Sequence, residues 1–227
     1  MTGTVSPHEY TTVKSPSESQ HRRELEVRRS RFIAVVQHVS TVEEARGQLA
    51  ELRREFHDAR HLCSAYVIGP RREIQRSHDD GEPSGTAGAP MLEAVLKRVT
   101  RAGRTDLSDV AVVVVRYFGG VLLGAGGLVR AYSESVSRAL DSAPFVRRRL
   151  QQVLDIKVPH ADAGRLEHSL RSTGIEIIGH AYGHSVTISV AVPASAPGVS
   201  GFEARLASLT AGARTAERTS VRWVDSA

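Results

Sequence analysis

The alternation of hydrophobic and polar positions along the chain predicts both strands and helices. The longest apolar stretch lies within residues 109–116, where valines follow one another almost without interruption. A strand that is apolar on both sides needs cover on both faces, so this stretch predicts the central strand of a sheet. An arginine, two aromatic residues and two groups of glycines follow it. Residues 128–140 come next, with their apolar positions on one helical face.

The clearest predicted helix covers residues 42–56, where apolar side chains recur at helical spacing. Its start carries two overlapping capping boxes, in which a hydroxyl residue is followed three positions later by a glutamate. Ser40 with Glu43 forms one of them, and Thr41 with Glu44 forms the other. The sequence leaves open which box caps the helix.

A second helix is predicted to open near Pro90 and to end at Gly103, because proline is favoured in a first helical turn. The residues before it contain so many glycines and prolines that an irregular but ordered loop is predicted over 77–90. The remaining strands of this half are predicted at residues 10–13, 24–29, 32–37, 62–68 and 73–75.

The C-terminal part of the sequence reads as a separate module. Pro144 and the arginines at 147–149 mark the boundary, which gives domains 1–143 and 144–227. Beyond it, the pattern predicts strand, helix, strand, strand, helix and strand, the order of a ferredoxin-like βαββαβ domain. These elements are expected at residues 150–158, 162–172, 175–182, 185–192, 202–209 and 220–224. The predicted fold class is therefore α+β with two domains.

Composition narrows the class of protein. With 227 residues, 41% hydrophobic and 24% charged, the chain is typical of an ordinary globular protein. No segment approaches the roughly 20 apolar residues of a membrane helix, and the N-terminus lacks a signal-peptide pattern. Cys63 is the single cysteine, and its apolar neighbours predict a buried thiol on a strand rather than a catalytic one. These features favour a cytoplasmic protein without disulfides or membrane contact.

The charge balance is basic, with a formal net charge of +5 and a pI of about 9.8. Arginine supplies nearly all of it, since lysine occurs only at positions 14, 97 and 157. A basic surface is compatible with a polyanion such as RNA as partner. The candidate phosphate contacts are two arginine clusters, and the alternative is that these clusters are only a solvated turn and linker. The clusters are Arg28, Arg29 and Arg31, and Arg147, Arg148 and Arg149.

Three carboxylates lie close together in the predicted loop, at Asp79, Asp80 and Glu82. Their oxygens are the ligands that Mg²⁺ prefers, so binding of Mg²⁺ is one hypothesis, and no zinc-site spacing is present. The alternative is that Asp80 and Gly81 form a turn, while the carboxylates cap backbone amides or pair with arginines. No residue of the chain is assigned as a resident metal ligand.

Two glycine-rich segments are candidate anion sites. The first contains Ser84, Gly85, Thr86 and Gly88, which can line a phosphate, although the ending of a Walker loop is missing. The second follows the central strand, where glycines before a helix can aim backbone amides at an anion. Its glycines are Gly119, Gly120, Gly124, Gly126 and Gly127. The alternative is a tight corner that only glycine fits.

The segment Arg116, Tyr117 and Phe118 joins the strand to these glycines. An arginine beside aromatic residues can stack on bases or hold a phosphate. Equally, one of the aromatic rings can fill the core while Arg116 pairs with Asp79 or Asp80. Histidines near the loop are interpreted as structural rather than catalytic, and no catalytic residue is assigned.

Three segments together resemble a known family. They are Ser30-Arg31-Phe32-Ile33-Ala34, the segment Asp79–Gly88 with its acidic and glycine residues, and Val115–Gly120 with Gly124. In this order and spacing they closely resemble the IMPACT/YigZ family, and the resemblance is strong over residues 5–140. The remainder of the chain looks like the domain that accompanies bacterial members.

The resemblance implies more about the fold than about the function. The N-terminal domain is expected to be an α/β sandwich similar to domain 2 of a small-subunit ribosomal protein, with a left-handed βαβ crossover. General handedness rules would predict the opposite hand. The C-terminal domain is expected to resemble domain V of elongation factor G. Eukaryotic members regulate translation by competing for the activator of a starvation-responsive kinase, and no catalytic residue is established for the family.

These observations predict a cytoplasmic, non-enzymatic regulator linked to translation that binds RNA or a ribosome-associated protein. The alternative is an enzyme or sensor in which Mg²⁺ at the acidic loop and the glycines before residue 128 hold a small phosphorylated ligand. Both hypotheses expect the acidic loop, Asp79–Gly88, to pack beside the segment Arg116–Gly120 at the end of the central strand.

Overall fold

The computed structural model describes residues 8–14, 21–100 and 103–226. The chain divides into two compact units, which meet at Arg147 and Arg148. We call the part up to Arg147 the N-terminal unit and the segment Arg148–Ser226 the C-terminal unit. The sequence places the boundary at 143/144, a few residues earlier. Strand β7 (Phe145–Val158) is continuous over this stretch, so the division falls within a strand.

The N-terminal unit is built on an antiparallel sheet with β6 (Val110–Tyr117) at its centre. The strand order is β2-β3-β6-β4-β5, and every neighbouring pair is antiparallel. The prediction of a central apolar strand is confirmed, since Val110 to Arg116 are all buried. The other strands are β2 (His21–Val27), β3 (Ser30–His38), β4 (His61–Ile68) and β5 (Ile74–His78). Strand β1 (Glu9–Val13) pairs with β7 instead.

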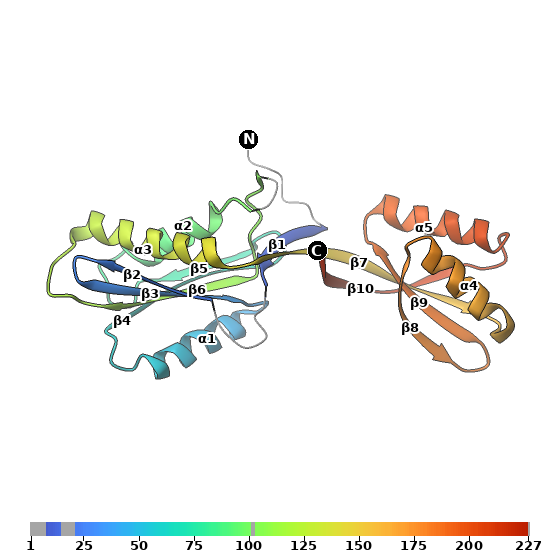
Figure 1. Cartoon of the computed structure of the whole chain (residues 1–227), viewed down its shortest axis with the longest axis horizontal. Helices are drawn as coiled ribbons and strands as arrows, with labels where there is room; N and C mark the ends of the chain where they lie inside the picture. Colours follow the sequence, from blue (N-terminus) through green and yellow to red (C-terminus); the bar gives the residue numbers. More distant parts are fainter. Residues whose placement is uncertain (1–7, 15–20, 101–102, 227) are drawn as a thin grey trace. The chain divides into compact units, whose positions relative to one another are not determined.

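Helices cover both faces of this sheet (Figure 1). Helix α1 (Val42–Glu55) lies on one face, and α2 (Gly88–Leu96) and α3 (Gly124–Ser142) lie on the other. Successive valines of β6 point alternately into the hydrophobic cores on the two faces of the sheet. Val112 and Val114 pack with α2 and α3, whereas Val113 and Val115 pack with α1. The uninterrupted apolar run is explained by this arrangement.

Two crossover connections of opposite hand link the strands. The first runs from β3 through α1 to β4, and the second runs from β5 through α2 to β6; each passes over one intervening strand. They step across the sheet in opposite directions, start from antiparallel strands and use opposite faces. Rotating the sheet by 180° about its normal superimposes the strands of the two connections, but their helices then lie on opposite faces. The two connections therefore have opposite hands, and one of them must be left-handed. This exception to the right-handed rule agrees with the expected family fold.

The start of α1 decides between the two capping boxes. The Thr41 hydroxyl accepts a hydrogen bond from the amide of Glu44 at 3.1 Å. The Glu44 carboxylate in turn accepts one from the amide of Ser40 at 2.5 Å. The box that starts at Thr41 is therefore correct.

The C-terminal unit has the predicted order of elements. Its sheet runs β10-β7-β9-β8, and its helices α4 and α5 pack on one face. The β7 side chains Leu154, Ile156 and Val158 form a core with Leu166 of α4 and Phe202 of α5. The further bounds are α4 (His160–Ser172), β8 (Glu176–Tyr182), β9 (Val186–Pro193), α5 (Ala196–Leu209) and β10 (Ala216–Ser226).

Several predicted boundaries are wrong around the glycines. Helix α2 starts at Gly88 and ends at Leu96, so it begins inside the predicted loop and stops well before Gly103. Strand β5 extends into the other end of that loop. Helix α3 begins at Gly124, about one turn before the apolar face that reveals it. Glycine lowers helix propensity only by about 1 kcal/mol, which packing overrides here. None of the helices in the described segments is long and apolar enough to cross a membrane.

Candidate functional site

Asp79 occupies the place where a phosphate was expected to bind. Its carboxylate accepts hydrogen bonds from the amides of Gly85 at 2.8 Å, Ala87 at 3.1 Å and Gly88 at 2.7 Å. These amides include the first turn of α2, whose donors have no partner within the helix. Burial acts to raise the pKa of Asp79, but the three amides outweigh it and leave the pKa below its usual value. The anion of this glycine-rich segment is therefore an internal one.

Asp80 forms a second structural anchor. It has a left-handed φ of 46° and is followed by Gly81 with φ 83°, which is the turn that the alternative reading predicts. Its carboxylate accepts hydrogen bonds from the Leu62 amide and from Arg53 of α1, both at 2.6 Å. Burial opposes ionisation here too, yet these partners lower the pKa of Asp80. The loop is thereby fixed to β4 and α1.

Glu82 is buried and pairs with Arg116, with 2.5 Å between Oε1 and Nη1. The Tyr132 hydroxyl of α3 donates to the same carboxylate oxygen at 2.8 Å. The Cys63 sulfur lies 3.3 Å from the Tyr132 oxygen and 2.9 Å from the Asp79 carbonyl oxygen. Burial raises the pKa of Cys63 to about 12 and also raises that of Tyr132. The network connects the acidic loop, β4, β6 and α3 inside the core.

Each carboxylate of the acidic loop (residues 79–88) thus has protein partners. The prediction that the loop packs beside the end of β6 is confirmed, but the predicted partner of Arg116 is wrong. Glu82 fills that role, because Asp79 and Asp80 point to amides and to Arg53. Within residues 8–14, 21–100 and 103–226, no three histidine, cysteine or carboxylate side chains gather as a metal site would require. Mg²⁺ would have to displace hydrogen bonds that hold the loop together.

The remaining polar residues of the loop also have structural roles. The Thr86 hydroxyl donates to the Pro83 carbonyl at 2.6 Å, and Ser84 is exposed. Gly88 must lack a side chain, since a Cβ there would lie 2.8 Å from the His78 amide nitrogen. Gly85, with φ 76°, closes the turn that aims its amide at Asp79.

The glycine corner, which we define as residues 116–127, packs against the turn between β2 and β3. A Cβ on Gly119 would lie 2.0 Å from the carbonyl carbon of Arg29, so only glycine fits. The Gly119 amide donates to the buried Ser30 hydroxyl at 3.2 Å. Gly120 and Gly124 have φ values of 84° and 71°, which favour glycine by conformation. The structure supports the alternative that Gly119, Gly120 and Gly124 form a tight corner that favours glycine.

The turn itself consists of Arg28 and Arg29, which we call the arginine turn. Val27 pairs with Ser30 across it, and both arginines have positive φ, 48° and 65°. This is a two-residue type I′ turn, for which Asn-Gly is the favoured sequence. Both side chains are exposed, and neither takes part in an ion pair or hydrogen bond with the described residues. The turn beside the glycine corner therefore carries two exposed guanidinium groups that have no partner among the described residues.

Residues of the corner alternate between the two faces of the sheet. Arg116 lies on the side of α2 and α3, with its guanidinium 5.5 Å from the Phe32 ring centre and 5.7 Å from that of Phe118. Tyr117 lies on the α1 side, where its hydroxyl donates to Asp58 at 2.8 Å. Phe118 is 52% exposed, so it covers Arg116 on one side and meets solvent on the other.

Two aliphatic side chains extend this apolar surface. Leu122 is 82% exposed and Val121 is 38% exposed. They precede α3, whose first turn has no side-chain cap. A Cβ on Gly126 would meet nothing within 4 Å, and one on Gly127 would touch only the Leu123 side chain at 3.0 Å. Packing therefore does not require glycine at position 126, whereas a methyl group on Gly127 would crowd Leu123.

The other predicted phosphate contacts are engaged or partly buried. Arg31 pairs with Glu24 at 2.8 Å and lies over the Tyr117 ring. Arg148 lies 3.4 Å from Asp225, and Arg149 also has an interaction partner. Arg147 is half-buried and lines a cavity shared with Glu9 and Asp106. Of the six candidates, the arginine turn supplies the freely presented pair.

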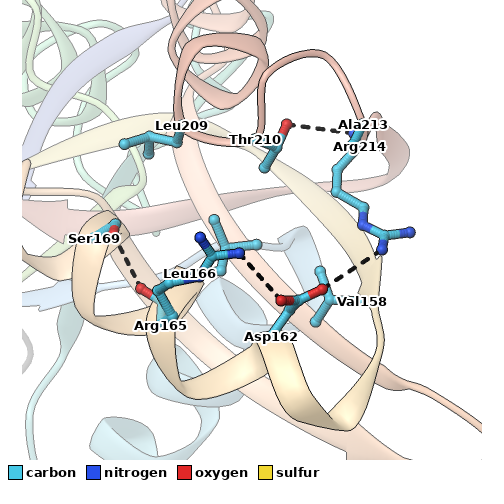
Figure 2. A pocket seen from close by; sticks show the side chains of 9 residues that line it. All are labelled: Val158, Asp162, Arg165, Leu166, Ser169, Leu209, Thr210, Ala213 and Arg214. Atoms are coloured by element: carbon cyan, nitrogen blue, oxygen red, sulfur yellow. Dashed lines mark hydrogen bonds and ion pairs between the residues drawn. The ribbon is translucent and has the colours of Figure 1, made fainter.

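The C-terminal unit holds a small cavity of about 120 Å³ that the sequence does not predict (Figure 2). Val158, Leu166 and Leu209 provide its apolar lining. At its rim, the Asp162 carboxylate lies between two guanidinium groups, 3.1 Å from Arg165 and 3.8 Å from Arg214. Asp162 already offsets one of the two positive charges, so the rim has little remaining attraction for an anion.

Sequence reasoning missed two residues of the N-terminal site. Tyr132 appears only as an apolar position of its helix, yet its hydroxyl completes the Glu82 network. Ser30 is a buried hydroxyl that receives the Gly119 amide. The available signal is that a tyrosine on a buried helical face needs a partner for its hydroxyl.

In comparisons with known protein families, the two parts of the chain match two different domain families. Residues 28–140 match the Impact N-terminal domain, and residues 156–213 match a domain of unknown function, DUF1949. The chain is 43% identical over 166 residues to the IMPACT family member YvyE of Bacillus subtilis, covering 73% of this chain and 71% of that protein. The protein belongs to the IMPACT family.

Further IMPACT relatives show the same relationship. YigZ of Escherichia coli is 36% identical over 189 residues, which cover 82% of this chain and 88% of that protein. A crystal structure titled only as a hypothetical protein is 32% identical, with a TM-score of 0.60 and coverage of 94% of this chain and 98% of the other. The arginine turn and the glycine corner both lie inside the matched Impact N-terminal domain.

Proposed function

We propose that this IMPACT-family protein is a cytoplasmic, non-enzymatic regulator linked to translation, and that it acts by binding RNA through the glycine corner and the arginine turn. The observation that carries the proposal is the arginine turn, whose exposed side chains have no partner among the described residues and whose backbone packs against Gly119, next to the exposed ring of Phe118. Arginine and an aromatic face are the two groups that proteins most often offer to phosphates and bases.

Local charge supports a polyanionic partner. The two segments that build this surface, residues 27–32 and 115–133, contain five arginines and no aspartate or glutamate. The carboxylate nearest in the network, Glu82, is buried and paired with Arg116. Two exposed carboxylates border the surface, since Glu24 pairs with Arg31 and Asp58 accepts a hydrogen bond from Tyr117. Arg28 and Arg29 have no such partner among the described residues, so their charges can attract RNA phosphates.

The backbone conformation of the arginine turn indicates that these two residues are arginines because of a function and not because of stability. A residue other than glycine in the left-handed region costs about 1–2 kcal/mol, and the turn holds two in succession. Such strain persists where another requirement determines the side chains. Binding of phosphate would be that requirement.

The alternative, an Mg²⁺-dependent enzyme or sensor for a small phosphorylated ligand, has less support. Its carboxylates are engaged, and the carboxylate of Asp79 fills the amide nest at the start of α2. The feature that still favours this alternative is the first turn of α3, whose backbone amides have no side-chain cap.

Binding of RNA and co-sedimentation with ribosomes test the proposal. Affinity for a ribosomal RNA fragment should fall steeply as salt rises, because each phosphate contact releases counterions. The double variant Arg28→Asn/Arg29→Gly removes both charges and keeps the turn type. It should lower the slope of log affinity against log salt by roughly one to two.

Arg46→Gln is the matched control, since Arg46 is an exposed arginine on α1 outside the corner. It should leave the slope and the affinity nearly unchanged. Absence of binding at low salt in both assays would overturn the proposal. Co-sedimentation that persists without any affinity for RNA would identify a ribosome-associated protein as the partner instead.

A further inference from the structure

We infer that the glycine corner binds unpaired, single-stranded RNA, with a base stacked on Phe118 and the adjoining phosphates held by Arg28 and Arg29. This inference rests on the proposed function and specifies the class of RNA that it involves. Its basis is the juxtaposition of an exposed apolar surface with two free guanidinium groups.

The apolar part of the surface cannot be satisfied by phosphates. Phe118, Val121 and Leu122 are 52%, 38% and 82% exposed and lie within five residues of one another. A double helix presents mainly phosphates and sugars to a protein, and its bases are stacked on one another. Only a base that has left such a stack can cover an exposed ring.

The ring of Phe118 is held in position for stacking. The guanidinium of Arg116 lies 5.7 Å from the ring centre, and the Glu82 pair in turn holds that guanidinium. A ring supported on one side and exposed to solvent on the other loses little freedom when a base stacks on it. The aliphatic side chains of Val121 and Leu122 then provide cover at the edge of the base.

The arginine turn lies within reach of the same strand. The backbone of Arg29 is packed directly against Gly119, the residue that follows Phe118. Each base of an RNA strand is attached to a sugar between two phosphates. A base stacked on Phe118 would therefore bring these RNA phosphates toward the arginine turn. Gly119 and Gly120, which separate Phe118 from the rest of the corner along the chain, have no side chains that could cover the ring or the turn.

The test compares an unstructured 12-nucleotide RNA with the 12-base-pair duplex of the same sequence, by fluorescence anisotropy at low salt. The single strand should bind at least tenfold more tightly to the wild-type protein. Phe118→Leu keeps an apolar cover over Arg116 but removes the aromatic face. It should weaken single-strand binding roughly 5- to 150-fold, the range for one base–aromatic stack.

Phe118→Trp should retain or strengthen single-strand binding, and the introduced indole should be quenched by the RNA. Tyr182→Leu is the control, because Tyr182 is an exposed aromatic residue (76%) of the C-terminal unit. It should leave single-strand affinity within about twofold, whereas Arg28→Asn/Arg29→Gly should weaken both RNA forms.

The outcomes separate this inference from the proposed function. Equal or tighter binding of the duplex, with Phe118→Leu unchanged, would overturn the inference and leave RNA binding in place. Failure of both RNA forms to bind would overturn both. Equal weakening by Phe118→Leu and Tyr182→Leu would likewise contradict stacking at the corner.

Discussion

The backbone of Arg29 lies where the side chain of residue 119 would otherwise be, since a Cβ on Gly119 would come within 2.0 Å of the Arg29 carbonyl carbon and 2.1 Å of its oxygen. This contact joins the turn between β2 and β3 to the end of β6. It places the backbone of the arginine turn beside the residue that follows Phe118, and this close approach requires that position 119 has no side chain.

Gly119→Ala is therefore expected to destabilise the N-terminal unit by about 3 kcal/mol, the upper part of the range for overpacking, because backbone must move to admit the methyl group. Gly126→Ala is the matched control. A Cβ there meets nothing within 4 Å, and it should stabilise α3 by about 0.5–1 kcal/mol. Urea denaturation followed by circular dichroism measures both. Equal effects of the two substitutions would contradict the proposed packing.

Glu82 and Arg116 are expected to behave as a coupled buried pair. Glu82→Met alone leaves a buried guanidinium without its carboxylate and should cost about 3–5 kcal/mol. Adding Arg116→Met should restore much of that loss, because an apolar pair of similar size replaces the ion pair. A double-mutant cycle from denaturation curves gives the coupling, and additive effects would contradict it.

The exposed pair of Glu134 and Arg138 provides the comparison. Their side chains are 48% and 56% exposed and lie one helical turn apart on α3. Glu134→Ala should cost less than about 0.5 kcal/mol. A similar cost at Glu82 would show that the buried network contributes little.

Acid should weaken the capping of α2 by Asp79. The pKa of Asp79 is lowered in the folded protein, so its contribution is fully present above the unfolded value of about 3.9 and is lost as pH falls through the lower folded value. Asp79→Ala should cost about 0.5–2 kcal/mol at pH 7, the range for a helix cap. The difference from wild type should shrink as the pH falls below about 4. Thermal melts across this range measure it, and a constant difference would argue against the ionised cap.

Cys63 should be unreactive until the N-terminal unit opens. Burial raises its pKa to about 12, and the side chain has no solvent exposure. Its thiolate fraction at neutral pH is therefore far lower than that of an ordinary exposed thiol. Since Cys63 is the single cysteine, its alkylation reports opening directly. Complete labelling within minutes at pH 8 in native buffer would contradict this assignment, and Glu82→Met should accelerate labelling.

Much of the fold is determined by local sequence patterns. The apolar run of β6 specifies a central strand, because alternate valines must enter two separate cores. The βαββαβ order of the C-terminal unit follows from alternating strand and helix periods. The helix starts near Gly88 and Gly124 were misplaced, because glycine carries no apolar periodicity and only packing places it in a helix.

The candidate site was predictable as a region but not in its pairings. Local sequence identifies the acidic loop, the glycine corner and the arginines as unusual, and it predicts that the loop and the corner meet. Only the tertiary structure decides that Glu82 rather than Asp79 or Asp80 meets Arg116, because side chains on different elements are paired by the fold. It also shows that Asp79 fills the expected phosphate nest and that Gly119 places Arg29 beside Phe118. Spacing along the chain determines which residues can share a surface, and long-range packing determines which of them remain free to bind.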